Sequence, residues 1–391
     1  MNFIFLGSKC WIRKPVVCEV FSFRISEFAI DGYLFTKGNC SGSVSHSPLS
    51  WFPLGLSPAL VGKFAFANTH KWFGRIAVWV AKFIPSCFLP TVPNTRMVRS
   101  LPTSPPRILV VWSHGRGGNV SDNFLMLSQL AVEIPAVVCG ITHTDGSADC
   151  FRSGNGEIYT YRASSPNAKC PEPWLDFKEY QLTLRVAEIR ETIEYIEKTM
   201  ALKFHKIIVA GFDIGGTTAV AASKVLPVSC IALDGLFCLF DKYPFPKAMF
   251  HQTMDGTPKE HQTEGVEARS STLLNTHRPE DVDTRSSTQL HTPDIPHTPR
   301  QQNILALIQS DEWEVWNAPV TFYTKQLNAC KLITVKQTNH WNFSEIIYWA
   351  PLPLLRFTGV IHRRGEPRKT YRRTTKWISS LISEYTQIEA M

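Results

Sequence analysis

One short stretch of the sequence, KIIVAGFDIGG at residues 206–216, restricts the fold more than any other. Its first residues are small or branched and apolar, as in a short buried strand. Gly211, Gly215 and Gly216 follow, and glycines at this density allow a sharp turn that bulkier residues would obstruct. A helical pattern begins near Thr217. The stretch therefore predicts a strand, a tight elbow and a helix in direct succession.

Apolar runs elsewhere predict further strands. Residues 108–112, 136–142 and 230–233 are almost continuously apolar, as in central strands of a parallel sheet, and residues 332–335 form a shorter run. Residues 174–200 have the clearest helical periodicity. Their apolar side carries Phe177, Leu184, Val186, Ile189, Ile193 and Ile196, and their charged side carries Glu188, Arg190, Glu191 and Lys198. This alternation predicts an α/β fold, with a mostly parallel central sheet flanked by helices.

Three residues with reactive side chains follow predicted strands: Asp213 inside the elbow, then Asp234, then His340. Each alone is ordinary, because a single Asp after a strand is usually a cap or turn residue. The chain order of nucleophile, acid and histidine, together with the GxDxG elbow, is typical of the α/β-hydrolase fold, where the elbow usually reads GxSxG. Asp234 would orient His340, and His340 would activate either the nucleophile or a water molecule.

A second glycine-rich turn begins at Gly115, directly after the strand at 108–112. In α/β-hydrolases a loop at this place donates one backbone N–H group to the oxyanion hole, and the residue after the nucleophile donates the other. We therefore expect the amides of Arg116 and Ile214 to bind the oxyanion. A phosphate-binding P-loop is the alternative, but the GK[ST] ending of that motif is missing.

Composition narrows the class of protein. With 391 residues, 44% hydrophobic and 19% charged, the chain can bury a large core, which excludes wholesale disorder. The net charge of +8 comes without the alternating basic and aromatic residues of a nucleic-acid module, so no nucleic-acid partner is expected. The ten cysteines form no CxxC pair or metal-like spacing. Cys139 and Cys230 fall inside predicted strands, which favours a reducing compartment.

The amino-terminal residues do not resemble a signal peptide, because their brief apolar run is soon followed by Lys9, Arg13 and Lys14. No uninterrupted apolar run reaches the roughly 18 residues that a transmembrane helix needs. The expectation is a cytoplasmic or peripheral membrane protein.

We expect one α/β-hydrolase domain over residues 1–391. Its parts are a hairpin region at 1–56 that turns at Asp31–Gly32, an amphipathic helical segment at 57–90, a core at 107–242, a disordered insertion at 243–302, and a C-terminal core with a basic tail at 303–391. Within the last part, residues 304–316 predict a helix and residues 320–323 a strand. The histidines of the insertion are too irregularly spaced to indicate a metal site.

Two segments are candidates for contact with a membrane. Residues 57–88 are rich in aromatic residues at helical spacing, and a helix packed over the core is the ordinary interpretation. The alternative is a face that touches lipid or a lid over a lipid site. The C-terminal segment carries Arg363, Arg364, Arg368, Lys369, Arg372 and Arg373. Such a run is usually a solvated face, and contact with anionic lipid is the alternative.

Five motifs in the right order resemble the platelet-activating factor acetylhydrolases and lipoprotein-associated phospholipase A2. They are VWSHG at 111–115, HTDGSA at 143–148, GFDIGG at 211–216, IALD at 231–234 and HWNF at 340–343. The family has an apolar pair before SHG, HRDxSA, GHSFGG, IALD and HxNF at these places. The resemblance covers roughly residues 50–250 and 318–350.

The resemblance implies an esterase that removes a short or oxidised sn-2 acyl group from a phospholipid, without calcium or another cofactor. It assigns Asp234 and His340 as the acid and base, and the Arg116 and Ile214 amides as oxyanion donors. Asp213 stands where the family has its nucleophilic serine.

This departure leaves three outcomes open, because a carboxylate attacks an ester poorly and would form a mixed anhydride. In the first, Asp213 attacks carbon by displacement, as in epoxide hydrolases and haloalkane dehalogenases. In the second, His340 activates water and Asp213 contributes only charge, which opposes the developing oxyanion and lowers activity. In the third, the chain is a pseudoenzyme that binds lipid without turnover.

Overall fold

The computed structural model describes residues 16–37, 48–50, 91–98, 106–148, 150–160, 172–201, 203–237, 304–311, 331–349, 352–357, 361–362 and 365–388. All of them belong to one of the two units into which the chain divides, Met1–Phe245 with Gln302–Met391. The second unit, Pro246–Gln301, lies outside the described residues, as does the whole segment at 57–90. The predicted insertion and the predicted amphipathic helix therefore stay predictions.

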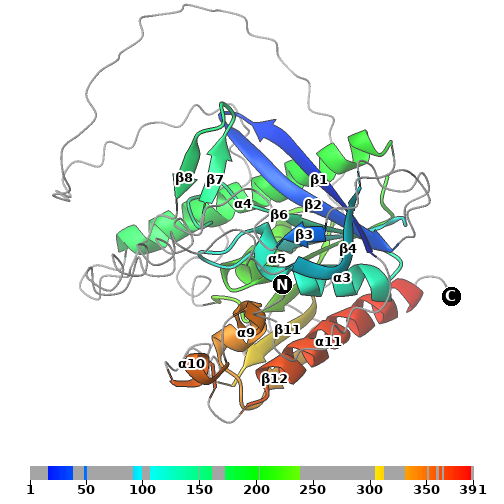
Figure 1. The fold of residues 1–391 in the computed structure, drawn as a ribbon. Helices are drawn as coiled ribbons and strands as arrows, with labels where there is room; N and C mark the ends of the chain where they lie inside the picture. The colour runs from blue at the N-terminus through cyan, green and yellow to red at the C-terminus, as the bar shows by residue number, and fades with distance from the viewer. Residues whose placement is uncertain are drawn as a thin grey trace, which may run out of the picture. The chain divides into compact units, whose positions relative to one another are not determined.

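The described strands form one twelve-stranded mixed sheet (Figure 1). Its main path runs β12 (Lys331–Val335), β11 (Ile304–Ser310), β10 (Ser229–Leu233), β9 (Lys206–Phe212), β5 (Ile108–Ser113), β6 (Val137–Ile141), β2 (Phe28–Lys37), β1 (Val16–Ile25), β4 (Thr91–Val98) and β3 (Pro48–Ser50), with β7 (Cys150–Ser153) and β8 (Ile158–Thr160) to the side. The six strands from β12 to β6 are parallel, and β2 joins β6 in antiparallel register. This is the mostly parallel sheet that the sequence predicted.

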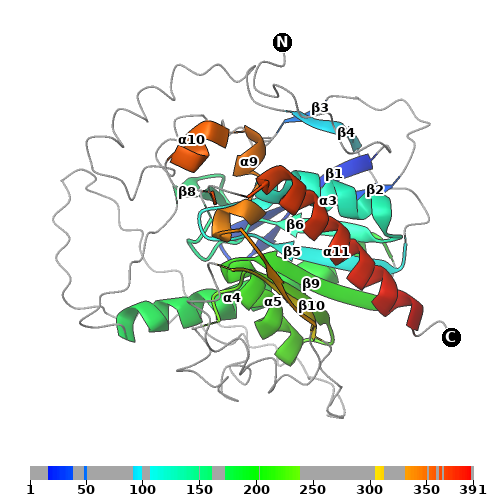
Figure 2. The same cartoon turned by 90° about the horizontal axis from the view of Figure 1, so that it is seen from below.

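Helices cover both faces of the sheet (Figure 2). One face packs against α3 (Phe124–Glu133) and α11 (Pro367–Ile388), and the other against α4 (Glu172–Thr199) and α5 (Ile214–Val225). Because successive side chains of a strand point to opposite faces, β5 contributes Val110 and Trp112 to the first core and Leu109 and Val111 to the second. A strand that is buried on both faces reads as a continuous apolar run, which is why the sequence located it.

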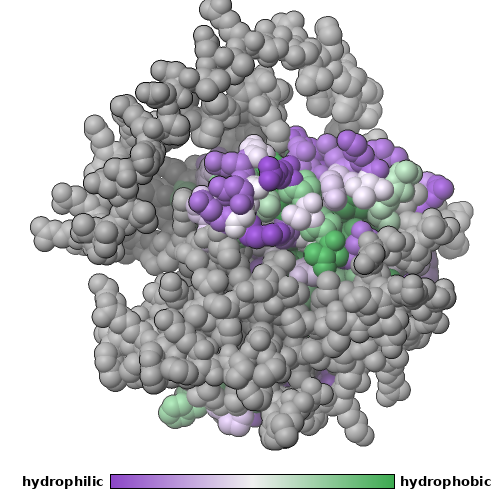
Figure 3. All heavy atoms as spheres, turned by 45° about the horizontal axis from the view of Figure 1, so that its top comes forward, coloured by the Kyte–Doolittle hydropathy of each residue, from purple (hydrophilic) through white to green (hydrophobic). Residues whose placement is uncertain are grey.

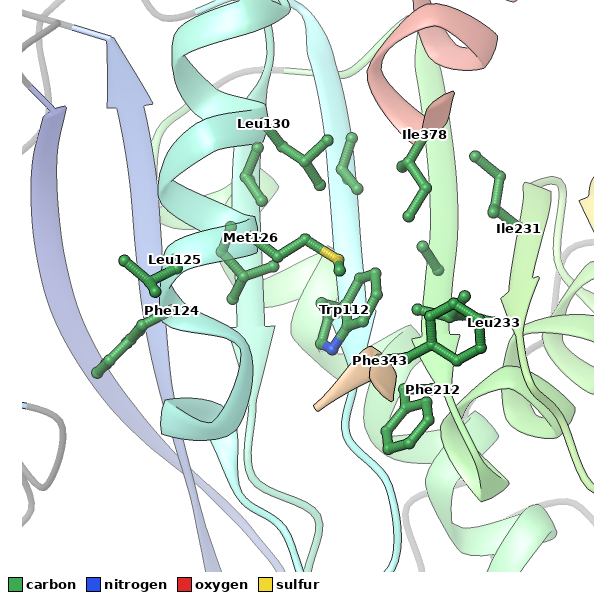
Figure 4. Packing of buried hydrophobic residues seen from close by; sticks show 14 of the residues in the cluster. Trp112, Phe124, Leu125, Met126, Leu130, Phe212, Ile231, Leu233, Phe343 and Ile378 are labelled. Carbon is green, nitrogen blue, oxygen red and sulfur yellow. The ribbon is translucent and has the colours of Figure 1, made fainter. Parts of the chain in front are cut away.

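The first core is filled by large side chains from several segments. Figure 4 shows Trp112 of β5 with Met126 and Leu130 of α3 and Ile378 of α11. The Trp112 ring is fully enclosed, and its Nε1–H donates to Asn123 Oδ1 over 3.0 Å. A buried indole N–H needs such a partner, so this bond sets the orientation of the ring in the first core.

Two predictions of secondary structure are wrong. Residues 304–310 form β11, not a helix, since the seven-residue run ILALIQS is apolar on both sides and periodicity cannot separate a buried strand from a buried helix. The N-terminal hairpin exists, but it turns after Ile25, at Ser26, whose φ is 52°. Asp31 and Gly32 lie inside β2, where Gly32 pairs with Phe21. The predicted strand at 320–323 lies outside the described residues.

The described surface carries few large apolar side chains, and Figure 3 shows hydrophilic and hydrophobic residues mixed on one face. The exposed ones are Val20, Tyr159, Tyr180, Trp341 and Phe357. Isolated apolar residues of this kind are ordinary on protein surfaces. Among the helices of the described residues, none combines the length and the apolar character needed to cross a membrane.

Candidate active site

The elbow presents Asp213 from the middle of the sheet. Asp213 lies between β9 and α5 with φ 57° and ψ −127°, a conformation that is costly for a residue with a side chain and is held by its surroundings. Its N–H donates to Leu233 O on β10, and its own carbonyl accepts from the N–H of Gly216. The carboxylate is buried, with 2% of the residue exposed. The strained backbone therefore holds the Asp213 side chain in one position at the carboxyl edge of the parallel strands.

The elbow glycines allow a close approach of backbones. A Cβ atom on Gly215 would lie 2.0 Å from Ser113 O, and one on Gly211 would lie 2.3 Å from Gly215 O. Both distances are shorter than any real contact, so α5, β9 and the end of β5 could not pack as they do. Gly115, in the loop opposite, would place a Cβ 3.1 Å from the Cβ of Asp213.

Replacing Gly215 by alanine is expected to lower the free energy of unfolding by about 3 kcal/mol or more, since the new methyl group meets backbone that cannot yield. Gly216→Ala is the matched comparison, because its Cβ would lie 3.1 Å from Gly211 O, a tight contact that a shift of a few tenths of an ångström relieves, whereas the Gly215 contact is about 1 Å shorter. The Gly216 variant should lose clearly less stability than the Gly215 variant, since alanine also favours a helix. Chemical denaturation of both variants measures the difference, and equal losses would contradict the steric explanation.

The second predicted acid, Asp234, is completely buried and pairs with His340. Its Oδ2 lies 2.8 Å from His340 Nδ1, while its Oδ1 accepts from the Ser310 N–H over 2.7 Å. The Ser310 hydroxyl contacts both oxygens, at 3.2 and 3.1 Å. With Nδ1 bonded to the carboxylate, the Nε2 atom of His340 faces the elbow and lies 3.6 Å from Asp213 Oδ1. The structure therefore brings together the three side chains that the sequence singled out.

The position of His340 depends on the segment that follows it. His340 opens the short helix η4 (His340–Phe343), and its ring stacks on Phe212 with centroids 4.5 Å apart. Two residues after η4, the buried Glu345 accepts from the N–H groups of Leu125 and Met126, at 2.6 and 3.2 Å, and from the Tyr371 hydroxyl. A carboxylate at the first turn of α3 suits the helix dipole, so Glu345 anchors the histidine segment to the core.

The predicted oxyanion donor Arg116 is engaged with Asp213 itself. Its backbone N–H donates to Asp213 Oδ2 over 2.8 Å, and its Nε–H donates to the same oxygen over 3.1 Å. Asp213 Oδ1 has no hydrogen-bond partner within the described residues. Ile214, the other predicted donor, is the first residue of α5, where N–H groups lack a partner inside the helix. A carboxylate oxygen thus accepts from the N–H group of Arg116 that the sequence predicted to bind an oxyanion.

The electrostatics of the site favour the charged form of Asp213. Burial acts to raise the pKa of Asp213. The Arg116 charge, His340 and the hydrogen bonds from Arg116 act in the opposite direction and outweigh burial, so the pKa of Asp213 lies below its ordinary value of 3.8. The carboxylate is therefore ionised at neutral pH, and its contribution to stability disappears as the pH falls through this lowered pKa. Burial, and then the Arg116 charge, lower the pKa of the nearby Lys178 to about 8.

The sequence did not reveal a set of buried polar residues beside the loop that follows β5. Glu188 was predicted on the charged, outward side of its helix, and this is wrong: it is 1% exposed. Its carboxyl group lies 2.5 Å from His143 Nδ1, and His143 Nε2 lies 2.8 Å from Ser113 Oγ. Arg185, one helical turn earlier, is also fully buried. The three-residue spacing of Arg185 and Glu188 was the available signal, since residues three apart share a helix face.

Other predicted elements have different outcomes. The described residues contain no group of metal-ligating side chains, and the histidines of the insertion lie outside them. Arg368, Lys369, Arg372 and Arg373 lie on α11, where the Arg368 Nε–H donates to Ile347 O. Arg363 and Arg364 lie outside the described residues. Contact of residues 57–88 or of this basic C-terminal segment with a membrane stays a prediction.

Among the solved structures with a similar fold are two esterases. The ferulic acid esterase from Streptomyces cinnamoneus aligns with a TM-score of 0.52 and 12% identity, over 95% of this chain and 90% of that one. Carboxyl esterase 2 from the fungus Tuber melanosporum aligns with a TM-score of 0.40 and 10% identity, over 96% and 88%. No protein-family model and no curated protein matches the sequence. At such identity the first similarity supports the fold alone. The protein has the α/β-hydrolase fold, with an aspartate in the tight turn between β9 and α5.

Proposed function

We propose that the protein is a phospholipid esterase of the platelet-activating factor acetylhydrolase type, which turns over short sn-2 acyl esters slowly because Asp213 replaces the serine. The observation that carries this proposal is the arrangement of Asp234, His340 and the Arg116 N–H around residue 213. His340, oriented by Asp234, and the N–H of Arg116 both face residue 213. A base with its orienting acid and an oxyanion donor are what acyl transfer requires.

Two charges near the elbow support a substrate that carries phosphate. Arg116 and Lys178 interact electrostatically with each other and with Asp213, and Arg116 is partly exposed, with 35% of its side chain accessible. Guanidinium and ammonium groups are the usual partners of phosphate oxygens. The five sequence motifs point to the same class of substrate.

In the native chain, ester hydrolysis would proceed through water. His340 Nε2 takes a proton from a water molecule, whose oxygen attacks the ester carbonyl carbon, while Asp234 stabilises the imidazolium. The carbonyl oxygen, which becomes the oxyanion, must displace Asp213 Oδ2 from the Arg116 N–H. The tetrahedral intermediate then breaks the bond to the sn-2 alcohol oxygen, which receives the proton from His340. The displacement and the repulsion between carboxylate and oxyanion make this route slow.

The substrate class is tested with the Asp213→Ser variant, which removes the carboxylate. Its kcat/KM for 2-acetyl phosphatidylcholine is expected to exceed that for a long-chain phosphatidylcholine, and for methyl ferulate, by at least about 10-fold. Titration of released acid in mixed micelles measures all three. A folded variant that hydrolyses only the soluble ester would overturn the phospholipid assignment. One that hydrolyses none would overturn the esterase proposal.

A second candidate function is favoured by the orientation of the Asp213 carboxylate. Oδ2 is held by Arg116, whereas Oδ1 has no hydrogen-bond partner in the part of the chain that the structure describes and faces His340. Oδ1 could attack a saturated carbon, breaking its bond to an epoxide oxygen, which keeps the electron pair and then takes a proton. Water activated by His340 would hydrolyse the resulting ester at the Asp213 carboxyl carbon. A wild-type protein that converts a short terminal epoxide to its diol, with loss in Asp213→Ala, would favour this reaction.

A further inference from the structure

The Arg116 N–H is presented by a loop whose backbone is fixed on both sides. Before it, His114 Nδ1–H donates to Gly115 O over 2.7 Å, and His114 Nε2 accepts from the His143 N–H over 3.0 Å. After it, the Gly117 N–H donates to Ser147 O over 2.6 Å. Two of these contacts, through His114 and through Gly117, therefore tie the loop to the segment 143–147.

The segment 143–147 is in turn fixed by two residues of α4. Arg185 donates to Asp145 Oδ2 over 2.8 Å, to His114 O over 2.9 Å and to Ser113 Oγ over 3.2 Å. Glu188 accepts from the Thr144 N–H over 2.9 Å and contacts His143 Nδ1. All these side chains are buried. The chain of contacts thus runs from α4 to the N–H of Arg116.

We propose that Glu188 is a positioning residue: acting through His143, it holds Ser113 and His114 so that the Arg116 N–H points at residue 213. The path has two steps. Glu188 bonds His143 Nδ1, and His143 reaches the end of β5 through its ring, at Ser113 Oγ, and through its backbone, at His114 Nε2. Loss of Glu188 would free the His143 ring, which contacts Ser113, and would remove the acceptor of the Thr144 N–H, which holds the backbone beside His143.

The charges around Glu188 indicate which protonation state of its carboxyl group bonds His143. The groups facing it are His143 and Thr144, with Asp145 and Arg185 close by. Burial, and then the Asp145 charge, raise the pKa of Glu188 to about 8, and burial lowers the pKa of His143 well below its ordinary value. These shifts favour a neutral carboxylic acid, whose O–H donates to Nδ1, beside a neutral imidazole that carries its own proton on Nε2. A glutamine can replace that neutral acid, since its NH2 group donates to Nδ1 and its oxygen accepts from Thr144.

The test compares Glu188→Gln with Glu188→Leu, each in the wild type and in Asp213→Ser. This inference rests on the proposed function for its kinetic readout. In Asp213→Ser, the leucine variant should lower kcat for 2-acetyl phosphatidylcholine about 100-fold with little change in KM, as for a misplaced oxyanion donor. The glutamine variant should stay within about threefold of its parent. In the wild type, the Arg116 amide resonance after selective ¹⁵N-arginine labelling should move with leucine and not with glutamine.

The controls separate positioning from folding. Thr192→Val changes another buried side chain of α4, which bonds Glu188 O rather than the loop, and should move neither readout. If the leucine variant does not fold, Ser113→Ala removes the His143 contact with a smaller change and should still shift the Arg116 resonance. A folded variant with an unmoved resonance and an unchanged kcat overturns the proposal. The resonance decides even where Asp213→Ser hydrolyses no ester, so the two proposals fail separately.

Discussion

Replacing Asp213 by serine is expected to raise kcat for 2-acetyl phosphatidylcholine by about 10²- to 10³-fold, the range over which one oxyanion donor acts. In the wild type the Arg116 N–H is bonded to Asp213 Oδ2 at 2.8 Å. A serine has no atom that reaches this N–H from the elbow, so the donor becomes available to the substrate. Its hydroxyl would also face His340, which gives the base a proton to take.

Two further substitutions separate these effects. Asp213→Asn keeps the shape of the side chain and an oxygen able to accept from Arg116, but it removes the negative charge. The displacement step then remains without the repulsion, so this variant should be faster than the wild type and slower than the serine variant. Asp213→Ala frees the N–H without supplying a nucleophile, and should fall well short of the serine variant. Phospholipid turnover by the three purified variants, with circular dichroism to verify folding, measures the series. Equal rates for alanine and serine would show that the elbow side chain is not the nucleophile.

Much of the fold could be predicted because its central strands are buried on both faces. Such strands read as short apolar runs, and the glycines at 211, 215 and 216 fixed the elbow between β9 and α5. β11 was wrongly predicted as a helix because its sequence is apolar on both sides. Only its pairing with β10 and β12 determines that it is a strand. The turn of the N-terminal hairpin escaped because Asp31–Gly32 is a common turn pair, whereas the close pairing of Gly32 with Phe21 is a tertiary contact.

The candidate site likewise contains residues that the sequence could predict and contacts that only the fold determines. Chain order and strand ends were enough to select Asp213, Asp234 and His340, since loops after parallel strands meet at one edge of the sheet. The Arg116–Asp213 contact could not be predicted, because it depends on two side chains 97 residues apart and on the charge between them. Glu188 escaped because helical periodicity assigns a charged residue to solvent unless a buried partner is known. His143 is that partner, and only the fold brings it within 2.5 Å.

Replacing Asp234 by asparagine in the Asp213→Ser variant is expected to lower kcat by about 10⁴-fold while leaving the fold intact, as for a triad whose histidine adopts the wrong tautomer. The geometry determines this outcome. Asp234 Oδ1 accepts from the Ser310 N–H over 2.7 Å, so the asparagine oxygen must take that position. Its NH2 group then faces His340 Nδ1, which can only accept, and the proton moves to Nε2, where a base is needed.

Asp311→Asn provides the matched control for this experiment. Asp311 follows β11, and its carboxylate accepts from the N–H groups of Gln337 and Thr338, at 2.7 and 2.9 Å, in the turn before His340. It approaches the same segment of chain but has no hydrogen bond to the imidazole among these contacts, so its loss should change kcat by about threefold or less. If Asp234→Asn is as mild as this control, His340 does not depend on Asp234 for its tautomer. The base would then have to act without its acid, and the acyl-transfer arrangement proposed for this site would be wrong.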